Sequence, residues 1–106
     1  MTETEFLDRA EATLEQVASS VDRAAIEAEC NLSALVLTLD FDDGARMVVN
    51  AQTPMRQLWL ATRAGGMHFG FDGRNWCDLR SGEEFFDALS RVVSEHLGRE
   101  LRLHPR

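Results

Sequence analysis

The sequence predicts an α+β fold, a two-layer α/β sandwich in which N- and C-terminal helices pack on one face of a six-stranded, mostly antiparallel sheet. Three observations predict it. Apolar residues recur at helical spacing near both ends, the segment between them alternates with a period of two, and tight turns separate the alternating runs. Two amphipathic helices need one common apolar surface, which one sheet face provides. The length suits a single domain, residues 1–106.

The first helix is expected over residues 4–22, with Thr4 as its N-cap. The apolar residues at helical spacing are Phe6, Ala10, Leu14, Val17 and Val21. Asp8, Glu11, Glu15 and Asp22 project within an arc of roughly 60° beside this stripe. The helix therefore carries an apolar face flanked by an acidic one.

The alternating region predicts six strands and the turns between them. The strands are expected over residues 26–32, 35–41, 45–51, 55–61, 67–71 and 75–79. The segment 42-DDG-44 is typical of a hairpin, Pro54 breaks the ladder, and Gly65-Gly66 and Asp72-Gly73 mark further turns. These short connections favour an antiparallel meander.

The segment 81-SGEE-84 predicts the start of the second helix. Ser81 is the expected N-cap, and Glu84 is at helix position N3, as in a capping box. Its apolar face is expected to comprise Phe85, Leu89, Val92, Val93, His96 and Leu97. Gly98 is the expected stop signal.

The composition excludes several function classes. A net charge of −7 disfavours contact with nucleic acid or anionic lipid, and no apolar run reaches the roughly 20 residues of a membrane span. The acidic N-terminus lacks the positive charge of a secretory or transit peptide. We therefore expect no nucleic acid or membrane partner and a cytoplasmic location.

No catalytic constellation can be assembled from the sequence. The histidines, His68, His96 and His104, are scattered, and no Gly-rich nucleotide loop or HExxH pattern is present. Cys30 and Cys77 lack zinc-site spacing and are expected to be reduced, mostly buried thiols. We expect a protein that is not an enzyme and has no organic cofactor.

Carboxylates are the candidate metal ligands. Clustered oxygen donors without imidazole or thiolate suit Fe, Mn, Ca or Mg, and the absence of a convergent loop predicts weak surface binding. The other interpretation is an ordinary solvated helix face. The candidate ligands are Glu3, Asp8, Glu11, Glu15, Asp22, Glu27 and Glu29.

The stretch 46-RMVVNAQTPMRQLWLATRAGG-66 carries the candidate partner-binding residues. Alternation places Leu58 and Leu60 toward the helices and Trp59 on the opposite face, where nothing remains in the sequence to cover it. Two interpretations are open, namely recognition of a protein partner by an exposed tryptophan, or lateral packing of the indole on its neighbours. The residues expected to share this outer face are Asn50, Gln52, Gln57 and Trp59.

The spacing of these residues resembles the signature of the frataxin family, and most closely its bacterial branch. The similarity lies in Val49-Asn50-x-Gln52-x-Pro54-x-x-Gln57-Leu58-Trp59-Leu60-Ala61 followed by Gly65-Gly66. Glu5-Phe6, 38-TLDFDDG-44, Asp72-Gly73 before Trp76, and 80-RSGEEFFDAL-89 extend it over nearly the whole chain. The resemblance implies a single frataxin-like domain in the bacterial cytoplasm.

The resemblance implies weak iron binding (Fe2+/Fe3+) on the acidic surface and docking on the cysteine desulfurase and the iron-sulfur scaffold protein. The face of Asn50, Gln52, Gln57 and Trp59 then resembles the family's partner-binding sheet surface. The chain departs from its bacterial relatives at 18-ASSVDRAAIEAE-29, where the acidic run is thinner, which weakens the case for multi-site iron binding.

Three functions compete at this point. The first is a non-enzymatic, iron-binding regulator of iron-sulfur cluster assembly, monomeric or forming iron-induced oligomers. The second is an interaction scaffold whose iron binding is incidental. The third is a ferroxidase or iron-storage protein, which ranks last because the sequence shows no preorganised metal site.

Overall fold

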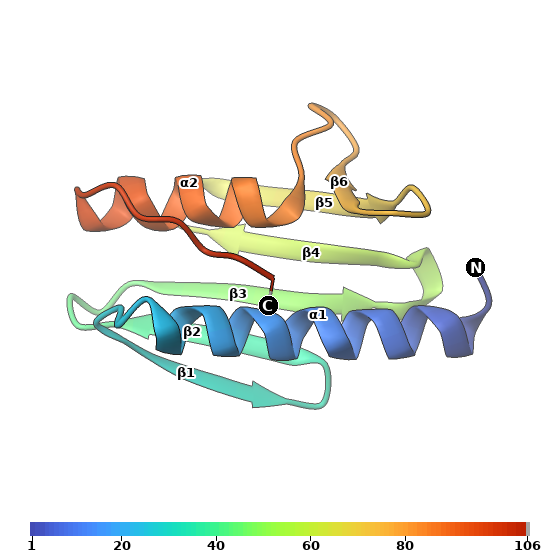
Figure 1. The fold of residues 1–106 in the computed structure, drawn as a ribbon, viewed down its shortest axis with the longest axis horizontal. Helices are drawn as coiled ribbons and strands as arrows, with labels where there is room; N and C mark the ends of the chain where they lie inside the picture. Colours follow the sequence, from blue (N-terminus) through green and yellow to red (C-terminus); the bar gives the residue numbers. More distant parts are fainter. Residues whose placement is uncertain (106) are drawn as a thin grey trace.

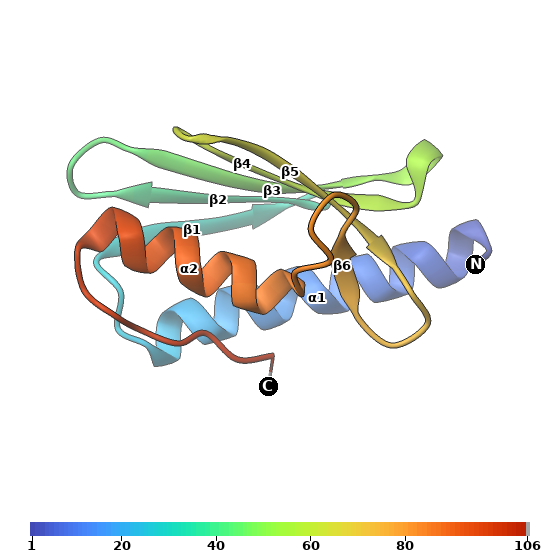
Figure 2. The ribbon, with the colours of Figure 1, turned by 90° about the horizontal axis from the view of Figure 1, so that it is seen from above.

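A computed structural model describes residues 1–105 of the protein. Helices α1 (Glu3–Arg23) and α2 (Phe85–Leu97) lie on one face of a six-stranded sheet whose spatial order follows the sequence. All neighbouring strands are antiparallel, and Figures 1 and 2 show that both helices cover the same face. The predicted fold class is confirmed. The strands are β1 (Ala28–Ser33), β2 (Val36–Phe41), β3 (Arg46–Gln52), β4 (Gln57–Thr62), β5 (Gly65–Phe71) and β6 (Trp76–Asp78).

Helix α1 begins one residue earlier than the sequence suggests. Its N-cap is Thr2, whose hydroxyl accepts from the Glu5 amide while the Glu5 carboxylate accepts from the Thr2 amide. The prediction that Thr4 is the N-cap is wrong, because this reciprocal capping box satisfies the first free amides two residues upstream. The predicted apolar stripe is confirmed by the burial of Phe6, Ala10, Leu14, Val17 and Val21.

Helix α2 uses Glu84, and not Ser81, as its N-cap. The Glu84 carboxylate accepts from the amides of Phe86 and Asp87. The Ser81 hydroxyl instead donates to Asp78 Oδ2 at 2.7 Å and belongs to the preceding loop. The predicted stop is confirmed, since Gly98 adopts a left-handed conformation at φ 69°.

The turns partly match the expected ones. Gly44 takes φ +88° in the predicted hairpin turn between β2 and β3. Pro54 lies in a short 3-10 helix, η1 (Thr53–Met55), so β4 begins two residues later than expected. Gly65-Gly66, predicted as a break, instead opens β5, and the turn is formed by residues 63–64.

The core lies between the helices and the strand residues that face them. Phe69 packs edge-to-face on Phe85, with ring centroids 5.1 Å apart, and Phe6 packs likewise on Trp76 at 5.9 Å. No helix among residues 1–105 is long and apolar enough to cross a membrane. The main sheet residues of this core are Leu37, Leu39, Met47, Val49, Leu58, Leu60 and Phe69.

Candidate functional site

The two helices leave one face of the sheet uncovered (Figure 2). The four predicted partner-binding residues lie together on that face. In the register of β3 and β4, Asn50 is directly opposite Trp59 and Gln52 is directly opposite Gln57. Strand alternation puts all four on the same side, while their neighbours Leu58 and Leu60 are buried beneath the helices. The predicted juxtaposition follows from this register, whereas the partner-binding role stays a prediction.

The polar groups of this cluster are only partly engaged with one another. Gln57 Oε1 accepts from the Trp59 indole N–H at 2.8 Å, and Asn50 Oδ1 accepts from Gln52 Nε2 at 2.7 Å. Within residues 1–105, the Asn50 and Gln57 amide nitrogens and the Gln52 amide oxygen form no hydrogen bond. The cluster therefore offers donors and an acceptor to a molecule that docks on it.

The sequence predicts a substantially exposed Trp59, because nothing remains to cover its face of the sheet. In the structure the side chain is only partly exposed. The His68 imidazole stacks on the indole, with ring centroids 4.2 Å apart and planes 9° from parallel. His68 is directly opposite Trp59 in the register of β4 and β5 and is itself exposed. Lateral packing thus covers part of the indole, although the side chain stays at the surface.

We call the set of Val36, Asn50, Gln52, Gln57, Trp59 and His68 the helix-free patch. Val36 on β2 is opposite Asn50 on β3 and is 40% exposed, so it adds an apolar side chain to the patch. Beyond Thr38 and Val48, this face is bounded by an ion pair between Arg46 and Asp40, at 2.6 Å. The hydrogen bond to Asp40 raises the pKa of Arg46, which keeps this boundary charged. The patch itself holds no acidic and no arginine side chain.

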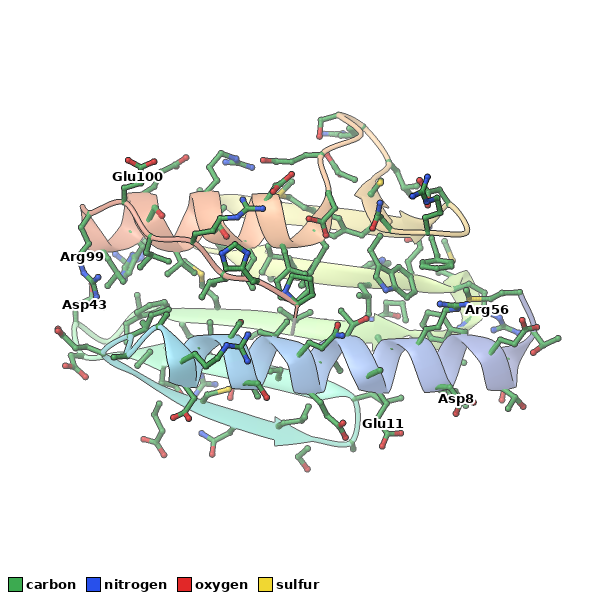
Figure 3. All side chains as sticks on the ribbon, in the orientation of Figure 1. Asp8, Glu11, Asp43, Arg56, Arg99 and Glu100 are labelled. Carbon is green, nitrogen blue, oxygen red and sulfur yellow. The ribbon has the colours of Figure 1, made fainter. Side chains whose placement is uncertain are left out.

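The seven candidate metal ligands are all exposed. Figure 3 shows Asp8 and Glu11 projecting from α1 away from α2. Glu11 and Glu15, one helical turn apart, line a groove of about 350 Å3 between α1 and the turn that joins β1 to β2. Glu29 is on β1, opposite Asp40, and so faces the helix-free side. None of the seven makes an ion pair within residues 1–105.

The donor set suits a hard cation, but its geometry supplies no closed site. No group of three or more His, Cys, Asp or Glu side chains in residues 1–105 is placed to hold one metal ion. Carboxylate oxygens are what iron takes in the absence of imidazole or thiolate. One or two of these carboxylates could hold an ion that keeps most of its water, which corresponds to exposed, weak binding.

The cysteines and the other histidines stand apart from both surfaces. Cys30 and Cys77 are free and half-buried, and desolvation raises the pKa of both thiols, with Asp72 adding to the effect at Cys77. His96 Nε2 is buried and lies 2.9 Å from Asp43 Oδ2, but the angle between the two groups does not allow a hydrogen bond. None of these residues brings a nucleophile and a base together.

The order of helices and strands is the one that the sequence resemblance implies, and comparison with known proteins tests the family directly. A sequence model of the frataxin-like domain matches residues 1–99. The chain belongs to the frataxin family. The resemblance drawn from the Asn50 to Gly66 stretch is thereby confirmed.

Two relatives of this frataxin-family chain are named iron-sulfur cluster assembly protein CyaY. That of Ralstonia nicotianae is 48% identical over 99 residues, covering 90% of this chain and 88% of the relative. That of Bordetella avium is 49% identical over 106 residues, covering 92% and 94%.

Solved frataxins have the same fold. Frataxin from Psychromonas ingrahamii, described as a member of the CyaY protein family, superposes with a TM-score of 0.89 at 26% identity and covers 96% of this chain and 97% of its own. Trimeric frataxin from Saccharomyces cerevisiae, complexed with ferrous iron, gives a TM-score of 0.62 at 26% identity, with 92% and 86% covered.

Proposed function

We propose that this protein is an iron-binding regulator of iron-sulfur cluster assembly in the bacterial cytoplasm, and that it is not an enzyme. It docks on the cysteine desulfurase and the iron-sulfur scaffold protein through the helix-free patch and the acidic face of α1. The names of its relatives support the pathway. The ferrous complex of the yeast relative supports iron as the metal, and its trimeric state is consistent with a monomer that assembles when iron binds.

The observation that carries this proposal is an uncharged aromatic and amide cluster on an uncovered sheet face. Centres of protein interfaces are depleted of charge and enriched in tryptophan, and a few such residues dominate the binding energy. Trp59 is central here, with Asn50 and His68 beside it in register. The unused amide groups around it would supply directional hydrogen bonds to the partner.

Iron would be held on the acidic face by Glu11 and Glu15. Their side chains are neighbours at spacing i, i+4, roughly 5 to 6 Å apart at Cβ. An Fe2+ ion bound there adds positive charge to a surface that otherwise attracts a basic partner. Iron loading would therefore change the affinity for a basic patch on the desulfurase, which makes the protein responsive to iron.

Substitution of Trp59 tests the docking role. We expect Trp59→Ala to weaken binding to purified cysteine desulfurase roughly thirtyfold, the size of an interface hot spot. Thr38→Ala, on the same face but outside the patch, serves as the control and should bind within about twofold of the wild type, as expected outside a hot spot. Calorimetry with both variants decides the matter, and equal affinity for Trp59→Ala and wild type would remove the patch from the interface.

The alternative is an interaction scaffold whose iron binding is incidental, and the lack of a convergent metal site among residues 1–105 favours it. The test compares Glu11→Gln/Glu15→Gln/Asp22→Asn with a control that also removes three charges, Asp42→Asn/Glu95→Gln/Glu100→Gln. We expect only the first variant to lose the effect of Fe2+ on desulfurase affinity. If wild-type affinity is the same with and without Fe2+, the scaffold function replaces the regulator.

A further inference from the structure

Leu79 has the most exposed large apolar side chain among residues 1–105, since 60% of its surface is accessible. It directly follows β6, and its amide donates to the His68 carbonyl at 2.9 Å. The register of β5 and β6, in which Asp78 is opposite Phe69, therefore continues by one residue and puts Leu79 opposite His68. Facing residues of a ladder share a side of the sheet, so Leu79 lies beside His68 on the helix-free side.

The contact with Gly70 supports this position. Phe69 is buried toward the helices, so Gly70, its neighbour in β5, turns toward the helix-free side. A Cβ added to Gly70 would lie only 2.9 Å from Leu79 Cδ2, which is closer than real Cβ contacts. A glycine inside a strand often marks the close approach of another group. Here the leucine side chain lies across the bare backbone of Gly70 and still leaves most of its surface to solvent.

The backbone on both sides of Leu79 is held in place. The Asp78 amide donates to the Glu83 carbonyl and the Gly82 amide to the Asp78 carbonyl, both at 2.8 Å. The Asp78 carboxylate also accepts from the amide and the hydroxyl of Ser81. Leu79 is thus presented by a fixed loop, and a residue that is ordered before binding loses less conformational freedom when a partner docks.

Leu79 completes a row of facing residues that crosses the whole sheet. The row consists of Ser33, Val36, Asn50, Trp59, His68 and Leu79. Since neighbouring strands are about 4.8 Å apart, the row is about 24 Å long. A standard interface buries about 800 Å2 on each partner, which corresponds to a patch about 28 Å across. With Leu79 included, the row has the width of a protein interface, and exposed apolar side chains lie near both of its ends.

The rows on either side of this one are uncharged. They consist of Thr38, Val48, Ala61 and Gly66, and of Gln52, Gln57, Gly70 and Cys77. Desolvation raises the pKa of the Cys77 thiol, which keeps it neutral. A partner that covers Leu79 together with its neighbours on this side therefore meets apolar and amide groups. The complementary surface of that partner is uncharged as well.

We propose that Leu79, positioned by Gly70, extends the helix-free patch and inserts into an apolar hollow on the cysteine desulfurase. This inference rests on the docking function proposed above and specifies the partner surface. Continuity supports it, because Leu79 is the direct neighbour of His68, and a partner seated on Trp59 and His68 reaches the leucine next. The partner surface that fits is uncharged and has a hollow for one branched aliphatic side chain.

Substitution of Leu79 tests the contact by calorimetry with purified cysteine desulfurase. We expect Leu79→Ala to weaken binding roughly tenfold, because the apolar area that docking buries is removed. Leu79→Gln has a similar size but is polar, and it should weaken binding by at least as much. Leu79→Met keeps an apolar side chain of similar volume and should bind within about twofold of the wild type. The position is exposed, so the urea midpoint of all three variants should match the wild type.

A double-mutant cycle tests the positioning role of Gly70. Gly70→Ala keeps the leucine but pushes its side chain aside, and should weaken binding roughly fivefold. In a Leu79→Ala background the same change should alter the affinity by less than about twofold, because no leucine remains to be displaced. Gly66→Ala is the matched control on the same strand and side. A Cβ there meets nothing closer than the Leu60 carbonyl oxygen at 3.8 Å, so this variant should bind as the wild type does.

The outcomes separate this inference from the proposed function. If Trp59→Ala weakens desulfurase binding while Leu79→Ala and Leu79→Gln bind as the wild type does, the inference is overturned and the proposed function stands. If the Trp59 and Leu79 variants all bind as the wild type does, both fail together. Additive effects of Gly70→Ala and Leu79→Ala would overturn the positioning role of Gly70. Self-association of the wild type that Leu79→Ala abolishes would overturn the choice of partner and assign this surface to a second copy of the chain.

Discussion

Trp59 combines packing with surface presentation, and His68 is the residue that makes this possible. The imidazole covers one face of the indole, while the bond to Gln57 fixes the orientation of the ring. A side chain held in one rotamer before binding loses less conformational entropy when a partner docks. The stack therefore preorganises the helix-free patch, so the packing and recognition interpretations of Trp59 are compatible.

We expect His68→Ala to weaken desulfurase binding by roughly threefold to tenfold, because the indole must then be ordered on binding at a cost of about 0.5–1.5 kcal/mol. This loss is smaller than that of Trp59→Ala. His104→Ala, at an exposed histidine of the C-terminal tail, is the control. Calorimetry on the three variants measures the effect, and an unchanged affinity for His68→Ala would show that the stack has no role in preorganisation.

Asp78 is the buried carboxylate that ties the loop after β6 to the sheet. Desolvation raises its pKa, but hydrogen bonds from the Ser81 hydroxyl and amide and from the Arg80 amide outweigh this and lower it below the ordinary 3.8. Because the folded-state pKa is lowered, the stabilisation is present above pH 3.8. It is lost as the pH falls through the folded-state value.

We expect Asp78→Asn to lower the free energy of unfolding by about 1.5 to 3 kcal/mol at pH 7, the range for hydrogen bonds to a charged group. The difference from the wild type should shrink as the pH falls below 3.8. Urea titrations between pH 7 and pH 3 measure it. A difference that stays constant over this range would contradict the role of the ionised carboxylate.

At the scale of elements, the two helices show why caps are harder to predict than faces. The apolar stripe of α1 is repeated over several turns, so its periodicity identifies the buried face reliably. A cap is a single local contact, and Thr2 and Thr4 offer the same chemistry two residues apart. Only the reciprocal bond with Glu5 distinguishes them.

The capping assignment makes a direct prediction about stability. We expect Thr2→Ala to reduce the free energy of unfolding by about 1 kcal/mol, since it removes the hydroxyl that satisfies the Glu5 amide. Thr4→Ala, at an exposed position inside the helix, should change it by less than about 0.5 kcal/mol. Urea denaturation of both variants checks the pair, and a larger effect at Thr4 would restore the sequence-based assignment.

The hairpin between β4 and β5 explains why His68 is absent from the predicted site. A turn centred on Gly65-Gly66 would put Trp59 opposite Asp72. The true turn at residues 63–64 shifts the register and puts Trp59 opposite His68. Arg63-Ala64 carries none of the residues that the two-residue hairpin rule favours, whereas the adjacent glycines are a strong local mark of a turn.

At the scale of the whole molecule, periodicity predicted the fold class and the face on which Asn50, Gln52, Gln57 and Trp59 lie. This works because helix and strand periods determine which side chains must be buried together. The degree of exposure of Trp59 could not be predicted, because it depends on the contact with His68 on another strand. The dispersal of the α1 carboxylates, in contrast, agrees with the expected absence of a convergent loop.

The two proposed surfaces lie on different sides of the molecule. The acidic residues of α1 are on the helical layer, whereas the helix-free patch is on the far side of the sheet (Figures 2 and 3). β1 connects them at the sheet edge, where Glu29 faces the patch side and Glu27 precedes the strand. A partner complex that uses both surfaces must therefore extend around β1.

The central claim is that the helix-free patch docks on the desulfurase complex. The most direct measurement is an amide NMR titration of isotopically labelled protein, first with Fe2+ and then with unlabelled cysteine desulfurase and the scaffold protein. We predict that Fe2+ perturbs signals around Glu11 and Glu15, and that the proteins perturb Asn50, Gln57, Trp59 and His68. If the desulfurase and the scaffold protein perturb other signals but leave those of the helix-free patch unchanged, the account is contradicted.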